Sequence, residues 1–72
     1  MAYYERLREV REDADMTQAE LAHILGTTRQ QVGKYEAGTQ EMTVSKLATI
    51  CQTLGVSADY LLGLPPGLSW PR

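Results

Sequence analysis

Four glycines divide most of this chain into short segments, and they constrain its fold more than any other feature. Each follows a Leu or an Ala that closes a segment with apolar residues at helical spacing: Gly26, Gly38, Gly55 and Gly63. Glycine readily takes the left-handed backbone conformation that commonly lies just beyond a helix end. The pattern therefore predicts several short helices joined by tight turns.

The predicted helices also have marked beginnings. A capping box is a Ser or Thr followed three residues later by Glu or Gln, whose side chains and backbone N–H groups bond reciprocally. Two such boxes are expected, and two further residues are suitable N-caps. The boxes are Thr17 with Glu20 and Thr28 with Gln31, and the further caps are Thr43 and Ser57.

An apolar stripe runs along each predicted helix, and no segment is expected to form a strand. In the first helix the stripe follows 4-3-4 spacing through Tyr3, Leu7, Val10 and Ala14. The later helices are expected over 18–25, 29–37, 44–54 and 58–62. Their inward residues are Leu21, Ala22, Leu25, Val32, Tyr35, Leu47, Ile50, Cys51 and Leu54. The sequence thus predicts an all-α, five-helix domain over 1–64 and a C-terminal tail over 65–72.

Length and composition exclude several classes of protein. Seventy-two residues make one domain, which buries only about 60% of its unfolded surface. Cys51 is the lone cysteine and no Cys/His cluster exists, so neither disulfides nor zinc is expected, and no cofactor is implied. No apolar run reaches the ~20 residues of a membrane span and the N-terminus does not resemble a signal peptide. We expect a soluble, cytoplasmic protein.

Charge is distributed unevenly along the chain. The formal net charge is −2, which on average does not point to nucleic acid. Between Leu21 and Tyr35, however, there is no acidic residue, and Arg29 and Lys34 fall inside that window. The acidic residues are concentrated near the start: Glu5, Glu9, Glu12, Asp13 and Asp15. The sequence therefore predicts one positive segment beside a solvated acidic face.

Segments 18–25 and 29–37, joined through Gly26, have the pattern of a helix-turn-helix. Ala22 is small enough for two helices to cross closely, and Val32 and Tyr35 fill the angle behind the second helix. The outer face of that helix then carries Arg29, Gln30, Gly33 and Lys34, with Thr28 at its start.

This outer face suits DNA. Arginine can pair with guanine through two hydrogen bonds, glutamine can do so with adenine, and lysine can reach guanine or a phosphate. Thr28 caps its helix and can place backbone N–H groups near a phosphate. Gln18, at the first position of the preceding helix, can reach a phosphate and fix the register of docking.

Four runs of residues together resemble the Cro and phage-repressor helix-turn-helix family, the XRE type. They are Thr17–Ala22, Leu25–Thr28, Tyr35–Gly38 and Leu54–Leu62. The resemblance covers about Leu7 to Leu62 and implies a five-helix, lambda-repressor-like fold in which 29–37 is the recognition helix.

The resemblance also implies roles for individual residues. Base-facing positions fall on Arg29, Gln30, Gly33 and Lys34, and backbone-facing positions on Gln18, Thr28, Thr39 and Gln40. Arg11 and Glu36 match a structural ion pair. Two departures lower the expected number of DNA contacts: the loop after Gly38 lacks basic residues, and Gly33 stands where a polar side chain is usual.

The expected function is sequence-specific binding of double-stranded DNA, as a transcriptional repressor that forms a homodimer on a near-palindromic operator. One helix offers few base-reaching side chains, and two copies double the readout. Candidate residues of the dimer interface are Val56, Tyr60, Leu61, Leu64 and Trp70.

The residues also bear on two other classes of function. No nucleophile–base pair, paired carboxylate or phosphate loop supports an enzyme. An antitoxin or adaptor whose main partner is a protein, such as a toxin or an antirepressor, stays open because the chain is acidic overall. Arg6 and Arg8 are expected to be solvated beside nearby glutamates, and His23 is expected on the surface.

Overall fold

The computed structural model describes residues 2–64, which form five helices and the turns between them. The helices are α1 (Tyr3–Asp13), α2 (Gln18–Leu25), α3 (Arg29–Ala37), α4 (Val44–Leu54) and α5 (Ala58–Leu62). These bounds confirm the expected helices 18–25, 29–37, 44–54 and 58–62. The tail over 65–72 lies outside the described residues.

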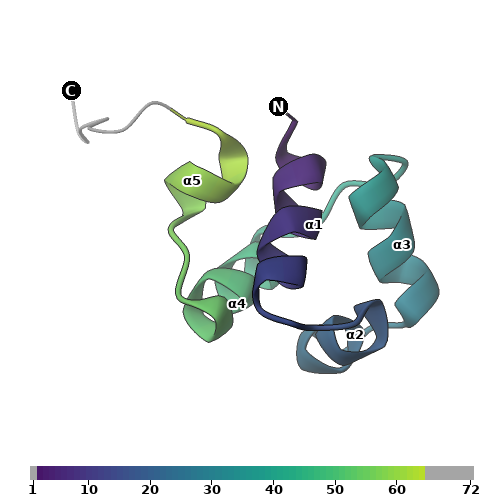
Figure 1. Cartoon of the computed structure of the whole chain (residues 1–72). Helices are drawn as coiled ribbons and strands as arrows, with labels where there is room; N and C mark the ends of the chain where they lie inside the picture. Colours follow the sequence, from purple (N-terminus) through teal and green to yellow (C-terminus); the bar gives the residue numbers. More distant parts are fainter. Residues whose placement is uncertain (1, 65–72) are drawn as a thin grey trace.

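Helix α1 lies in the middle of the molecule, with α3 on one side of it and α5 on the other (Figure 1). Helices α2 and α3 pack against each other, and α4 packs against both α2 and α5. The core between the helices consists of Leu7, Val10, Leu21, Ala22, Leu25, Val32, Tyr35, Ile50 and Leu61. Leu47, Cys51 and Leu54 pack against it from α4 as half-buried residues.

The expected caps are present, with one correction. Glu20 N donates to Thr17 Oγ1 over 3.1 Å and Thr17 N donates to Glu20 Oε1 over 2.8 Å, which completes the first capping box. Thr28 Oγ1 accepts from Gln31 N, but within residues 2–64 Thr28 N makes no return hydrogen bond to the Gln31 side chain. The prediction of a second reciprocal box was therefore wrong.

Two expectations about the helix faces were also wrong. Ala14 is exposed, because α1 ends at Asp13 and Ala14 forms its C-cap instead of continuing the apolar stripe. Arg6 is half-buried and not solvated beside a glutamate, since its guanidinium carbon lies 5.2 Å from the centre of the Tyr60 ring. This cation–π contact joins α1 to α5.

Candidate nucleic-acid interface

Helix α3 separates an apolar inner face from a polar outer face. Val32 and Tyr35 are 0% and 4% exposed and anchor the helix to the core. Arg29, Gln30 and Lys34, predicted to face bases, are all exposed, and Gly33 between them is half-buried. The structure therefore brings the predicted base-facing residues onto one accessible side of α3.

The turn before α3 sets the angle of this helix. Gly26 ends α2 with a φ of 68°, in the left-handed region. Thr27 N donates to Ala22 O over 2.9 Å, which closes the turn. Ala22 is 3% exposed, as expected of a small residue in a tight crossing of two helices.

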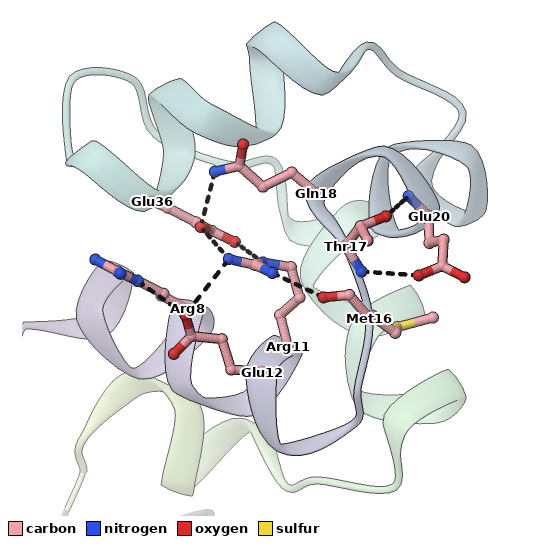
Figure 2. A network of polar contacts seen from close by, with 8 residues as sticks. All are labelled: Arg8, Arg11, Glu12, Met16, Thr17, Gln18, Glu20 and Glu36. Carbon is pink, nitrogen blue, oxygen red and sulfur yellow. Dashed lines mark hydrogen bonds and ion pairs between the residues drawn. The ribbon is translucent and has the colours of Figure 1, made fainter.

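Arg11 and Glu36 meet between α1 and α3. Arg11 Nε lies 2.6 Å from Glu36 Oε2, and Arg11 Nη2 donates to Glu36 Oε1 over 3.1 Å (Figure 2). A third donor, Arg11 Nη1, binds the carbonyl oxygen of Met16 over 2.7 Å. The hydrogen bonds to Glu36 raise the pKa of the Arg11 guanidinium. Burial acts to lower this pKa, and the negative charges of Glu36 and Glu12 raise it further, so the net shift is upward.

Gln18 belongs to the same network, which its place in the sequence did not indicate. Its Nε2 donates to Glu36 Oε1 over 3.1 Å, so Glu36 holds the first side chain of α2 as well as Arg11 (Figure 2). The spacing of 18 and 36 along the chain carries no signal of this contact. Nε2 has a second hydrogen, which leaves Gln18 able to donate to a phosphate.

The other predicted backbone-facing residues lie at opposite ends of α3. Thr28 is exposed at the N-terminus of the helix and its hydroxyl accepts from Gln31 N. Thr39 and Gln40 are exposed beyond the C-terminus, and the Thr39 hydroxyl donates to Lys34 O over 3.3 Å. Thr39 therefore also caps α3.

The proposed dimer residues do not all lie on the surface. Leu61 is 0% exposed, so its assignment to an interface was wrong: it belongs to the core. Val56 is half-buried against the core, whereas Tyr60 and Leu64 are exposed by 47% and 43%. Trp70 lies outside the described residues. Sequence reasoning missed two exposed apolar residues, Val44 and Leu62.

The remaining surface has few features that suggest other chemistry. His23 is exposed, as are Glu12, Asp13 and Asp15 near the end of α1. Arg8 pairs with Glu12 over 3.3 Å, as expected. Across residues 2–64, no group of three or more His, Cys, Asp or Glu is placed to hold a metal ion. None of the described helices has the length and apolar character to cross a membrane.

A family model described as "Helix-turn-helix" matches residues 7–61. The chain belongs to this family. It is the Cro and phage-repressor type that the sequence resembles, and several of its relatives are named as helix-turn-helix transcriptional regulators. The chain is 43% identical over 58 residues to the SPbeta prophage-derived HTH-type transcriptional regulator YonR of Bacillus subtilis. That alignment covers 81% of this helix-turn-helix chain and 54% of the relative.

A second relative bears on the alternative function. The antitoxin PezA of Streptococcus pneumoniae is 33% identical over 57 residues, covering 79% of this chain and 36% of PezA. The chain spans about half the length of the first curated relatives that it matches, 54% and 55%.

Solved structures agree with the family. The P22 c2 repressor in complex with a synthetic operator superposes with a TM-score of 0.78 and 27% identity, over 86% of this chain and 94% of that one. Hydroxypropylphosphonic acid epoxidase from S. wedmorenis superposes with a TM-score of 0.74 and 34% identity, over 97% of this chain and 36% of the epoxidase. The same helical unit thus occurs as part of an enzyme.

Proposed function

We propose that this helix-turn-helix domain is a transcriptional repressor that reads a near-palindromic operator as a homodimer, in the cytoplasm of a prokaryotic cell. The observation that carries the proposal is the likeness to the P22 c2 repressor, which was solved on operator DNA and is matched over 94% of its chain. The exposed polar side of α3 supports it. The proposal assigns no reaction to the chain.

In this proposal α3 lies in the major groove, which is wide enough to admit a helix. Arg29 and Gln30 stand in its first turn, where base edges come within reach of a recognition helix. Lys34 follows one turn later. Gln18, Thr28, Thr39 and Gln40 contact the sugar–phosphate backbone and fix the orientation of the helix.

A binding selection from random duplex DNA tests the proposal, followed by titration of the enriched site. We expect Arg29→Ala to weaken binding to that site by about 1–3 kcal/mol and to relax the preference at one base pair. Arg29→Lys is the matched control, because it keeps the charge but loses the two-hydrogen-bond geometry. Equal weakening on all sequences would assign Arg29 to phosphate, and a selection that enriches no sequence would contradict the proposal.

The antitoxin relative favours one second candidate, a domain whose main partner is another protein. The net charge of −2 and the uncharged loop residues Thr39 and Gln40 support it. A selection without enrichment, together with a stoichiometric complex with one protein when the chain is purified from its own host, would establish this alternative.

A further inference from the structure

A recess of about 360 Å³ lies beside α3, on the flank that faces α1 and the first residue of α2. It is lined by Arg8, Arg11, Gln18, Gly33, Glu36 and Ala37. Gly33 and Ala37 leave it open because neither carries a long side chain. A Cβ added at Gly33 would meet, within 4 Å, only Gln18 Nε2 at 4.0 Å.

The cationic groups of the recess differ in how they are bound. Arg11 is 11% exposed and directs Nε, Nη1 and Nη2 to Glu36 and Met16, so it is committed to the scaffold. The Arg8 side chain is 65% exposed, and within residues 2–64 it donates a single hydrogen bond, from Nε to Glu12. Both Nη groups of Arg8 are therefore available to a ligand.

The bond from Arg8 to Glu12 is weak. It spans 3.3 Å between side chains that are 65% and 52% exposed, and an exposed pair of this kind contributes little to stability. On its other side Arg8 borders a second recess that is lined by carboxylates: Glu5, Glu9, Glu12 and Glu36. Arg8 thus stands between an acidic surface and the flank of the recognition helix.

We infer that the recess between α1 and α3 receives a backbone phosphate of the DNA, and that Arg8 exchanges Glu12 for this phosphate on binding. The inference rests on the proposed function. A helix in the major groove has a phosphate strand along each edge of the groove, and a recess that adjoins Gly33 and Gln18 faces one of them. A backbone phosphate can accept two parallel hydrogen bonds from a guanidinium. Neutralising it also releases condensed counterions from the DNA, a gain that an exposed carboxylate does not offer.

This assignment explains how the chain could bind the DNA backbone although the loop after Gly38 carries no positive charge. The loop after Gly38 carries Thr39, Gln40 and Glu41, so it supplies no cation to the backbone of the DNA. Arg8 lies on α1 on the side of Glu36 (Figure 2), and it lines the recess together with Gly33 and Ala37 of α3. Helix α1 thus provides the positive charge that the loop lacks, and Glu12 holds that charge in place until DNA arrives.

The test measures DNA affinity against salt concentration for Arg8→Ala, Glu12→Gln and the double variant, with the full chain and the selected duplex. We expect Arg8→Ala to weaken binding about tenfold at low salt and to reduce the slope of log K against log[salt] by about 0.9. Glu12→Gln should tighten binding by about twofold or more, because it frees Arg8 and removes a negative charge. Thermal unfolding should change little in either variant.

Glu9→Gln is the matched control, since it removes the same charge one residue from Arg8 and leaves the Arg8–Glu12 pair intact. We expect the gain from Glu12→Gln to exceed that from Glu9→Gln, and to fall to the control value once Arg8 is alanine. An Arg8→Ala variant with unchanged affinity and salt slope would overturn the inference, as would a Glu12→Gln gain that does not depend on Arg8. Either result would leave the proposed function standing, because that is judged by the wild-type selection and by Arg29.

Discussion

At the scale of single residues, Glu36 joins three helices. It lies in α3 and accepts hydrogen bonds from Arg11 of α1 and Gln18 of α2. Its side chain is only 5% exposed, so its charge depends on Arg11 for compensation. Glu36, which is bound by Arg11, thereby also orients Gln18, a residue that is proposed to touch DNA.

The Arg11–Glu36 pair should be strongly coupled. We expect Arg11→Met or Glu36→Gln each to lower the free energy of unfolding by about 3–5 kcal/mol, because each leaves a buried charge or acceptor without its partner. The double variant should lose clearly less than the sum, as measured by denaturant unfolding. The exposed Arg8–Glu12 pair is the control and should show a coupling below about 1 kcal/mol. Additive effects at Arg11 and Glu36 would refute the assignment.

We expect the glycine at position 33 to strengthen DNA binding at the expense of the thermal stability of the domain. A glycine inside a helix costs about 0.5–1 kcal/mol relative to alanine, and the structure leaves room for a Cβ there. We therefore expect Gly33→Ala to raise the melting temperature by roughly 2–8 °C. It should also weaken DNA binding, because the bare backbone allows close approach to the groove. Unchanged or tighter binding would disprove this role for Gly33.

At the scale of helices, the packing of α1 against α3 depends on Gly38. This residue ends α3 with a φ of 78°, and a Cβ there would lie 2.7 Å from Cε1 and 2.8 Å from Cζ of the Tyr4 ring. Gly26 also has a positive φ, but a Cβ there would meet nothing within 4 Å. A side chain at Gly26 would therefore meet backbone strain alone, whereas a side chain at Gly38 would meet the same strain and also clash with the Tyr4 ring.

We expect Gly26→Ala to destabilise the fold by about 1–2 kcal/mol through the left-handed backbone alone. Gly38→Ala should cost about 1–3 kcal/mol more, because the Tyr4 ring must also move. Denaturant unfolding of both variants measures the difference. Truncating the ring with Tyr4→Ala should remove the excess in a double variant, and an equal cost at both glycines would show that the ring gives way freely.

Much of this arrangement could be predicted from local sequence. Helices α2 to α5 each begin at a Thr or Ser cap and end before a glycine, so their bounds depend on neighbouring residues alone. Leu61 was misplaced because α5 has five residues, too few for an apolar period to define its inner face. The stacking of Arg6 on Tyr60 and the bond from Gln18 to Glu36 join distant parts of the chain, which no local pattern reveals.

At the scale of the whole molecule, α5 carries the exposed apolar residues that the proposed homodimer would use. Tyr60, Leu62 and Leu64 are exposed by 47%, 39% and 43%. Helix α5 lies on the opposite side of α1 from α3, so an interface there leaves the recognition helix uncovered (Figure 1). Two-fold symmetry can then place two copies of α3 about 34–36 Å apart, one turn along the DNA.

We expect two copies on the full operator in analytical ultracentrifugation, and an affinity for the full site well above that for a half-site. Leu62→Glu should lower the full-site affinity toward the half-site value, because it places a charge in an apolar interface. Val44→Glu is the matched control, as Val44 is 81% exposed and lies on α4. A monomer on the full site, with equal affinities for half and full sites, is incompatible with the homodimer.

The burial of Leu61 has a consequence for the chain while it is being synthesised on the ribosome. Helix α5 packs against α1 and α4, and Leu61 is 0% exposed in the core. A nascent chain that has emerged only as far as residue 60 therefore cannot seal the apolar faces of its earlier helices. We expect a chain that ends at residue 60 to leave these apolar faces exposed and to be cleaved by proteases more readily than one that includes Leu61, although its α2 and α3 are complete.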